Sequence, residues 1–387
     1  MRKPNAPDPD PAPRHFIDYF EELPDPRVER RRDHKLVDVL FIGLCTMLTI
    51  GENFTDMEDF GRAKHGWFKK FLELPHGIPS HDTFNRVFSA IDPNHFLEIF
   101  VQWIQGMGSG APGEVVAIDG KALRRALDEG KSMPHIVSAW ATENGLTLGQ
   151  VKVDDKSNEI TAIPELLRVL ELKGCIVTID AMGCQKTVAG EIVNAGAGYV
   201  LALKNNHPTV LEEVAAYFED AVASQTSPGQ FHQPMDVHET LDKGHGRIEE
   251  RRYYHTADIA WFADKPLWPG LQSIGMVESV RHINGRATRQ RRYYLSSLEM
   301  DASNFARAVR GHWGVENPLH WSLDVNFGED QSRARTKFAA QNLATLRRLC
   351  LNLIKSHANP EKRSVRRQKR VAALSDDYLQ ELLGLNA

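Results

Sequence analysis

The chain has 387 residues, of which 42% are hydrophobic and 25% are charged, and its formal net charge at pH 7 is −4. This balance excludes an intrinsically disordered chain and a histone-like polycation, and the length predicts two or three structural units. The longest apolar run, residues 36–50, is fifteen residues long and contains Asp38. A bilayer-spanning helix needs about 20 residues without such a charge, so we expect a buried core helix there and no membrane segment.

The N-terminal stretch, residues 1–15, is rich in proline and contains no apolar run of the kind that a signal peptide requires. We therefore expect a short disordered lead and a cytoplasmic protein. The cysteines point the same way, because they are widely spaced and form no pair separated by two residues: Cys45, Cys175, Cys184 and Cys350. Such spacing is typical of reduced thiols rather than of a disulfide or zinc framework.

Residues 16–105 have apolar side chains at helical spacing, which predicts an all-helical domain that binds DNA or is associated with DNA binding. The sharpest local signal is IPSHDTFNRVFSAI, residues 78–91, in which Ser80 or Asp82 can cap a helix. Two interpretations of this helix are open. It is either a capped surface helix or a DNA-reading element that presents three polar side chains: His81, Asn85 and Arg86.

A Gly-rich linker at residues 106–114 precedes a change to short apolar strands. Strands are expected at residues 115–119, 135–143, 146–154, 175–180 and 198–204, with a tight turn at Asn144-Gly145. Helices are expected at residues 159–172 and 184–196. Three leading strands followed by alternating helices and strands predict an α/β fold, a mixed sheet flanked by helices in the order of the ribonuclease H-like fold. We assign residues 114–206 and 301–358 to this catalytic domain.

The regular alternation is interrupted at residues 207–300, where we expect an insertion made of a helix followed by β-strands. Within it, RQRRYYLSS (residues 289–297) pairs arginines with tyrosines, which suits stacking on distorted or single-stranded DNA ends. The alternative is a strand with one polar face, which would show the same alternation of arginines and tyrosines without any role in DNA binding. The chain ends in a basic tail with a short helix, residues 359–387, in which six of the ten residues from 361 to 370 are basic.

Two aspartates close short apolar strands: Asp119 ends VVAID and Asp180 ends IVTID. In the ribonuclease H-like order these two strands are neighbours, so their carboxylates are expected close together. Like charges at such a distance repel unless a proton or a cation lies between them. Mg²⁺ is the simplest such cation, because it prefers oxygen ligands and keeps positions for water and for phosphate oxygens.

A third carboxylate is needed for the chemistry that such a site performs. Two ions about 3.5–4 Å apart can activate a water or a 3′-hydroxyl and stabilise the leaving oxygen of a phosphoryl transfer. Glu316 in GHWGVENPLHW, residues 311–321, is the candidate, since no basic residue lies within three positions of it. Pro318 predicts that a helix starts or kinks just beyond it.

Two alternatives to this use of Glu316 are open. Other acidic residues downstream can supply the third ligand: Asp324, Glu329 and Asp330. A zinc site can instead be built from side chains at a four-residue spacing: His312, Glu316 and His320.

Taken together, these motifs resemble the insertion-sequence transposases of the DDE type. The resemblance rests on LPDPRVERRRDHKLVDVL and IPSHDTFNRVF in the helical region, on VVAIDGKALR, VTIDAMGCQ and LALKNNHP in the sheet region, and on RGHWGVENPLHWSLDVNFGEDQSRAR towards the C-terminus. It extends over nearly the full length. Within this type the chain resembles the ISAs-one group, also called H-repeat-associated proteins, of the broader IS-four-like class.

The resemblance implies a transposase that cuts DNA at the ends of its element and joins 3′-hydroxyl ends to target DNA, without a covalent protein–DNA intermediate. It makes Asp119, Asp180 and Glu316 the catalytic ligands of two Mg²⁺ ions, for which Mn²⁺ would substitute. The implied partners are the terminal inverted repeats and the target DNA, bound by a dimer or a higher assembly in the bacterial cytoplasm, at the nucleoid. The alternatives are a catalytically silent or domesticated DNA-binding relative, and a host ribonuclease H-like nuclease.

In one respect the chain departs from the pattern of the broader class. That class has a Tyr seven residues and an Arg four residues before the glutamate, and a Lys seven residues after it. This chain has Val309, His312 and Leu323 at those positions. Other residues must then contact the DNA, and the candidates are Lys121, Arg124, Lys204, Asn205, Arg310, His312, Arg333, Arg366, Arg367, Lys369 and Arg370.

Overall fold

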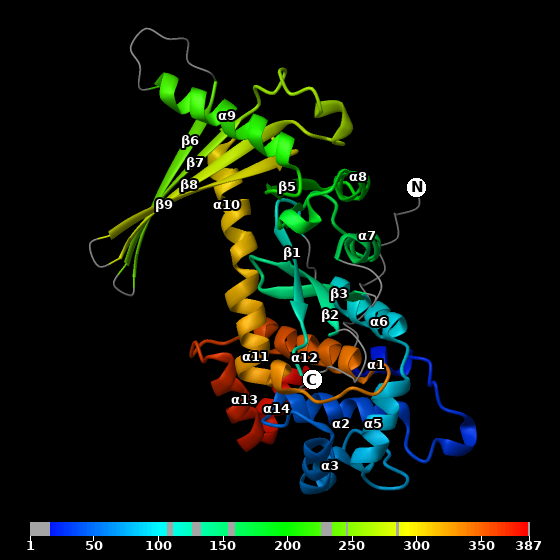
Figure 1. Cartoon of the computed structure of the whole chain (residues 1–387). Helices are drawn as coiled ribbons and strands as arrows, with labels where there is room; N and C mark the ends of the chain where they lie inside the picture. The colour runs from blue at the N-terminus through cyan, green and yellow to red at the C-terminus, as the bar shows by residue number, and fades with distance from the viewer. Residues whose placement is uncertain are drawn as a thin grey trace, which may run out of the picture. The chain divides into compact units, whose positions relative to one another are not determined.

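The computed structural model describes residues 16–106, 111–125, 133–153, 159–225, 234–244, 247–283 and 286–385. The expected disordered lead, residues 1–15, and part of the expected linker lie outside these residues. The chain divides into two compact units (Figure 1). The helical unit comprises residues up to 107 together with 326–328 and 332–387, and the sheet unit comprises residues 108–325 and 329–331. Of the helices in the described residues, none combines the length and the apolar character that crossing a bilayer would require.

The helical unit contains the helices predicted for its N-terminal part. They are α1 (Phe16–Glu21), η1 (Glu29–Arg31), α2 (Leu36–Leu48), α3 (Phe54–Ala63), α4 (His65–Phe68), α5 (His81–Ala90) and α6 (Pro93–Gly106). The apolar run that was expected to be a core helix is α2, which is buried over almost its whole length. This explains its composition, because a helix that is surrounded on every side has no need of a polar face.

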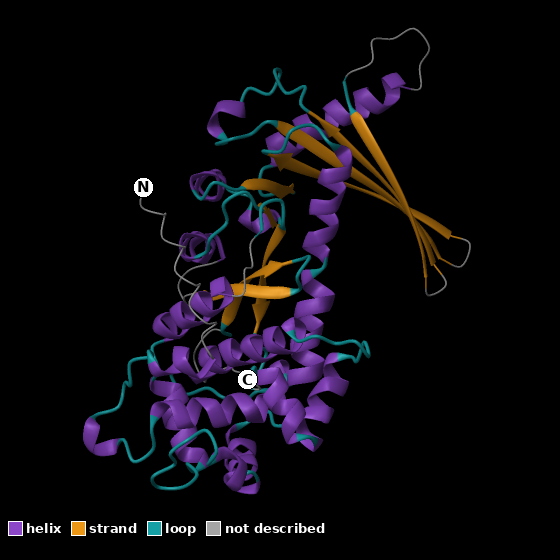
Figure 2. Ribbon diagram, turned by 180° about the vertical axis from the view of Figure 1, so that it is seen from behind, coloured by secondary structure: helices purple, strands orange, loops and turns teal. Residues whose placement is uncertain are grey.

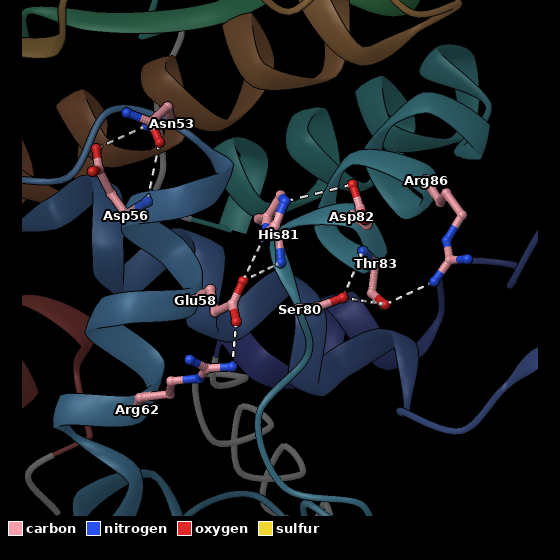
Figure 3. A network of polar contacts seen from close by, with 9 residues as sticks. All are labelled: Asn53, Asp56, Glu58, Arg62, Ser80, His81, Asp82, Thr83 and Arg86. Carbon is pink, nitrogen blue, oxygen red and sulfur yellow. Dashed lines mark hydrogen bonds and ion pairs between the residues drawn. The ribbon is translucent and has the colours of Figure 1, made fainter.

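Helix α5 begins where the sequence predicted, with Ser80 as its cap. The Ser80 hydroxyl accepts from the backbone N–H of Thr83, while Phe84 and Phe88 are fully buried on the inner face. On the outer face, the His81 ring nitrogen lies 2.7 Å from a Glu58 carboxylate oxygen, and Glu58 also pairs with Arg62 (Figure 3). Its polar side chains therefore have partners within the unit, which favours the interpretation as a capped surface helix.

The C-terminal part of the chain belongs to the helical unit, in contrast to the domain boundaries expected from the sequence. Helix α12 (Ala339–Ser356) packs against α2, α5 and α6, whereas residues up to 358 were assigned to the catalytic domain. The reason is its apolar circumference: nearly every residue of α12 is buried, and the buried Asn342 donates to the backbone carbonyls of Phe88 and Ile91.

The expected basic tail is a pair of helices, α13 (Val365–Leu374) and α14 (Asp376–Leu383), which pack against each other and against α12. Each begins with a serine cap: the Ser364 hydroxyl accepts from the N–H of Arg367, and the Ser375 hydroxyl accepts from the N–H of Tyr378. The tail is therefore part of a folded core, and only one face of α13 carries exposed charge.

The sheet unit begins with the alternation that the sequence predicted. Its first elements are β1 (Val115–Ala122), β2 (His135–Ala141), β3 (Leu146–Val153), α7 (Glu159–Val169), β4 (Ile176–Ile179), η2 (Ala181–Gly183), α8 (Lys186–Asn194) and β5 (Gly198–Leu203). Strands β2 and β3 are antiparallel to each other and β2 to β1, whereas β4 is parallel to both β1 and β5. The strand order in this part of the sheet is β3-β2-β1-β4-β5.

The insertion continues the same sheet, which the sequence did not reveal. Its elements are α9 (Pro208–Gln225), β6 (Asp236–Gly244), β7 (Arg247–Thr256), η3 (Lys265–Leu267), β8 (Ser273–Ile283) and β9 (Arg286–Ser296). Strand β9 pairs antiparallel with β5, so the described residues form one nine-stranded sheet that ends β5-β9-β8-β7-β6. The long antiparallel strands extend away from the rest of the sheet as a twisted ribbon (Figure 2). Helix α9 packs on β9.

Helix α10 (Ala302–Trp313) crosses the sheet and packs on strands of both its halves, β1 and β4 as well as β6 and β7. Two glycines permit this close approach. A methyl group on Gly275 of β8 would clash with the Phe305 ring, and a methyl group on Gly311 would lie 3.0 Å from Val115 of β1. Phe305 and Val309 are buried in the cluster beneath the helix, and burial of each such side chain stabilises the packing by about 1.5–3 kcal/mol.

The chain beyond α10 passes through a wide turn that contains Glu316 and Pro318. Residues Val315–Trp321 (η4) form a π-helical turn, followed by α11 (Ser322–Phe327) and η5 (Glu329–Gln331). Proline has no N–H to donate and its ring would collide with the carbonyl four residues earlier in an α-helix, so the backbone departs from α-helical geometry here. The expected effect of Pro318 is therefore present as a wide turn around Glu316, not as a helix start beyond it.

Candidate functional site

Asp119 and Asp180 lie at corresponding positions on neighbouring parallel strands. In the β1–β4 register, Ile118 is opposite Ile179, so each aspartate follows a paired isoleucine at the same edge of the sheet. Asp180 is also the cap of η2, since its carboxylate accepts from the backbone N–H of Met182 at 2.9 Å. The buried apolar strands therefore deliver two carboxylates to one place.

Glu316 lines the same cavity as the two aspartates, although it lies far from them in the sequence. The cavity has a volume of about 670 Å³, and its lining includes Asp119, Asp180 and Glu316. The η4 turn that carries Glu316 packs against β1. Other lining residues used below are Thr178, Lys204, Asn205, Arg292, His312 and Trp313.

The electrostatics of the cavity centre on Asp119. The pKa of its carboxyl is raised from 3.8 to about 7, chiefly by burial and also by the negative charges of Asp180, Glu159 and Glu316, against the opposing hydrogen bond from the Gly120 backbone. A ring nitrogen of His320 lies 3.7 Å from the Asp119 carboxylate. Asp119 is thus a carboxyl group that nearby like charges disfavour in its ionised form.

The three carboxylates have the chemistry that a hard divalent cation requires. They supply oxygen ligands only, as Mg²⁺ prefers, and a cation would relieve the repulsion that raises the pKa of Asp119. Across the described residues, no three His, Cys, Asp or Glu side chains are close enough to form a metal cluster. The carboxylates face one cavity with space between them, so closing around an ion would require side-chain movement.

The absence of a cluster among the described residues applies equally to the zinc alternative of His312, Glu316 and His320. His312 is instead held by the sheet, with a ring nitrogen 3.2 Å from the Thr178 hydroxyl. Burial lowers the pKa of His312, which disfavours the imidazolium form. It lines the cavity with its ring held beside Thr178.

The three downstream carboxylates that were considered as alternative third metal ligands, those of Asp324, Glu329 and Asp330, surround Lys121. Its ammonium group lies 2.6 Å from Asp324, 2.9 Å from Asp330 and 3.4 Å from Glu329. The Lys121 side chain is only 8% exposed. Lys121, which was expected to contact DNA phosphate, is thus paired with carboxylates inside the protein. Arg124, which also approaches Asp330, remains exposed.

Lys369 is also unavailable for DNA, contrary to expectation. It is 5% exposed, and its ammonium group donates to the backbone carbonyl of Asn326 at 2.6 Å and lies 3.8 Å from the centre of the Phe327 ring. Burial lowers its pKa to about 8. The helical period turns Lys369 inwards together with Gln368 and Ala372 of α13.

The remaining DNA-contact candidates are exposed or partly paired. Lys204 and Asn205 follow β5, line the cavity and are exposed. Arg310 lies 3.7 Å from Asp242. The candidates in the helical unit are exposed: Arg333, Arg366, Arg367 and Arg370.

Several residues that the sequence did not single out contribute to the site. Arg292 of β9 lines the cavity and stacks over the Trp313 ring at 4.3 Å, and the RRYY letters were its only local signal. Glu159 at the start of α7 accepts from His135 at 3.0 Å and lies so close to β1 that a methyl group on Gly120 would clash with it. No local pattern signals Glu159, because its partners lie on other elements.

Comparisons with known proteins found relatives over nearly the whole length of the chain. The family described as "Transposase DDE domain" matches residues 110–353, and "DDE_Tnp_1-associated" matches residues 17–104. "Putative transposase YncI" of Escherichia coli O157:H7 is 39% identical over 374 residues, covering 95% of this chain and 94% of that protein. "H repeat-associated putative transposase YhhI" of Escherichia coli K12 is 36% identical over 379 residues, covering 95% and 97%.

A solved structure is also similar: the cryo-EM structure of the piggyBac transposase synaptic complex with hairpin DNA, at a TM-score of 0.46 and 13% identity, covering 96% of this chain and 79% of that one. The family match alone extends over more than half of the chain. The protein belongs to the DDE transposases, and within that class to the group of H-repeat-associated proteins, as its motifs predicted.

Proposed function

We propose that this transposase cuts DNA at the ends of its element and joins the resulting 3′-hydroxyl ends to target DNA. The observation that carries the proposal is the convergence of Asp119, Asp180 and Glu316 on one cavity. Gathering like charges around one cavity is unfavourable by itself. A bound divalent cation would offset the repulsion between the carboxylates. Phosphoryl transfer is the reaction that paired divalent ions promote.

Asp119, Asp180 and Glu316 would hold the two metal ions, for which Mg²⁺ fits and Mn²⁺ would substitute. When bound, such ions activate the attacking oxygen and stabilise the leaving oxygen of the phosphoryl group. The task of the chain is to present ionised carboxylates. For Asp119, whose pKa is about 7, this requires the loss of a proton from its carboxyl group at neutral pH.

The same cavity offers groups that can hold a DNA backbone. We propose that Lys204 and Asn205, which are exposed beside the carboxylates, contact phosphate oxygens, and that Arg292 does so from β9. Half-buried His312, whose ring lies beside Thr178, lines the same cavity. The proposed partners are the terminal inverted repeats and the target DNA, bound by a dimer or a higher assembly.

We further propose that β1 to β5 with α7 and α8 form a ribonuclease H-like core. The strand order β3-β2-β1-β4-β5 supports this assignment, together with the antiparallel pairing of β2 and β3 and the parallel pairing of β4 with β1 and β5. In that core the site lies at the ends of adjacent strands, where Asp119 and Asp180 are found.

The test uses the full-length protein and duplexes from the DNA that flanks its coding region, which should contain the inverted repeats. We expect Mg²⁺-dependent nicks at the element boundary and, with a pre-cleaved end, joined product on a plasmid target. Binding without cutting would identify a catalytically silent DNA-binding relative. Cutting without joining would identify a nuclease, and either result would contradict the proposal.

A further inference from the structure

Strand β1 and the chain segment η4–α11 face each other at two places, called here the first and the second level: Asp119 with Glu316, and Lys121 with Asp324. Asp119 and Lys121 are two residues apart in β1 and therefore project from the same face of the strand. On the other side, Glu316 and Asp324 are eight residues apart, within η4 and α11. Asp119 faces the cavity with Glu316, and Lys121 contacts Asp324 at 2.6 Å.

The two levels carry opposite electrostatics. At the first, Asp119 and Glu316 are two carboxylates that line one cavity, and like charges in that position repel, which pushes the two elements apart. At the second, the positive charge of Lys121 meets Asp324 and, from the adjoining η5, Asp330 and Glu329. The attraction between Lys121 and these carboxylates therefore holds the η4–α11 segment against β1, whereas the repulsion between Asp119 and Glu316 drives the two apart.

Burial strengthens the second level. Lys121 is 8% exposed and the Glu329 side chain is 0% exposed, and charge pairs in such surroundings are screened by water far less than surface pairs. The contact also closes a loop of 203 residues between Lys121 and Asp324. No contact inside η4 or α11 could fix their position relative to β1 in the same way.

We propose that Lys121 is a positioning residue for the metal site: it holds the η4–α11 segment against β1, so that Glu316 stays beside Asp119 before any cation binds. This inference rests on the proposed function, in which Asp119 and Glu316 are metal ligands. Lys121 touches neither substrate nor metal in this role. Its charge offsets the mutual repulsion of the ligands, and its removal allows Glu316 to move away.

The experiment measures Mn²⁺ affinity of the full-length protein without DNA, by isothermal titration calorimetry. Residues that orient a metal ligand typically change affinity by 10–100-fold, so Lys121→Met should weaken Mn²⁺ binding by about 10-fold or more. Lys121→Arg keeps the charge and should retain most of the affinity. Arg168→Met is the control, because it breaks an ion pair between α7 and α8 in the same unit and should leave Mn²⁺ binding unchanged.

A second variant guards against misfolding of Lys121→Met. Asp324→Asn removes the partner on the α11 side, at a side chain that is 31% exposed, and should also weaken Mn²⁺ binding. Circular dichroism establishes that each variant is folded before titration.

The outcomes separate this inference from the proposed function. Asp119→Asn should abolish Mn²⁺ binding; if it binds as the wild type does, the proposed metal site is wrong and the inference falls with it. If Asp119→Asn abolishes binding while Lys121→Met and Asp324→Asn bind normally, only the inference is overturned.

A melting experiment in EDTA gives a readout that a purely structural ion pair would not change. Lys121→Met should lower the melting temperature less in the wild-type background than in Glu316→Gln, because only in the wild type does release of the segment also relieve the repulsion between Glu316 and Asp119. An equal drop in both backgrounds would show that Lys121 acts independently of Glu316, which would overturn the proposal.

Discussion

Asp119 and Asp180 each follow an isoleucine, Ile118 and Ile179, and these isoleucines are opposite each other in the parallel pairing of β1 with β4. The separation of the two aspartates is therefore set by the sheet, whose strands are buried and rigid. Glu316 depends instead on a π-helical turn and on contacts made over long sequence distances. The site thus combines a rigid pair of carboxylates with a third whose position must be maintained.

Replacing any one of the three carboxylates should abolish catalysis while leaving DNA binding intact. Asp119→Asn, Asp180→Asn and Glu316→Gln should each reduce nicking on the order of a thousand-fold, equivalent to about 4 kcal/mol of activation barrier. Nicking and gel-shift assays on the same element end would measure this. Asp264→Asn, which alters a carboxylate paired with Lys186 elsewhere in the sheet unit, should cut normally. Comparable losses in all four variants would contradict the assignment.

The metal-free protein should lose stability with rising pH because of Asp119. Its pKa is about 7 when folded and ordinarily 3.8, so between these values the folded state keeps a proton that the unfolded chain has released. Stability then falls as pH rises through this window, by up to about 1.4 kcal/mol per pH unit. In EDTA, Asp119→Asn should therefore be increasingly more stable than the wild type from pH 4 to pH 7. A difference that does not change with pH would refute this account of Asp119.

Gly120 should tolerate no side chain, since a methyl group there would clash with the Glu159 carboxylate. Gly120→Ala should cost about 1–3 kcal/mol of unfolding free energy, the usual cost of overpacking. Gly66 is the matched control, because it is an exposed helical residue with nothing within 4 Å of an added methyl group. Gly66→Ala should be neutral or stabilise by up to about 1 kcal/mol. Urea titration of both variants measures this, and equal effects would rule out the clash.

The exposed face of α13 should bind DNA backbone through Arg366, Arg367 and Arg370. Replacing all three by Ala should weaken binding to any sequence and reduce the slope of log affinity against log salt by about 3, or roughly one per lost phosphate contact. Lys369→Met should leave this slope unchanged and instead lower stability, because Lys369 is buried against Asn326 and Phe327. The idea fails if the triple variant keeps the wild-type salt dependence.

The features that could be predicted from the sequence are those encoded by neighbouring residues. Apolar runs that stop at Asp119 and Asp180 mark strand ends, and Ser80 before the apolar face of α5 marks a cap. Pro318 correctly signalled an irregular backbone near Glu316. Each of these signals acts within a few residues, where backbone geometry and side-chain periodicity decide the structure.

The features that could not be predicted depend on partners far away in the chain. Lys121 appears in the sequence as a surface lysine, and only its contact with Asp324, 203 residues away, shows that it is buried. Lys369 lies in a basic run in which Lys362, Arg366, Arg367 and Arg370 are exposed, and the packing of α13 against the core turns Lys369 inwards. The pairing of β5 with β9 likewise has no local signal.

The most direct test of the central claim is to locate bound metal. Crystals of the full-length protein soaked in MnCl₂ would give anomalous difference peaks at manganese positions. Convergence of the three carboxylates predicts peaks bounded by the Asp119, Asp180 and Glu316 oxygens, at the distances of about 2.0–2.2 Å that are typical of small divalent ions. Peaks that lie instead among Asp324, Glu329 and Asp330, with none at Asp119, would contradict it.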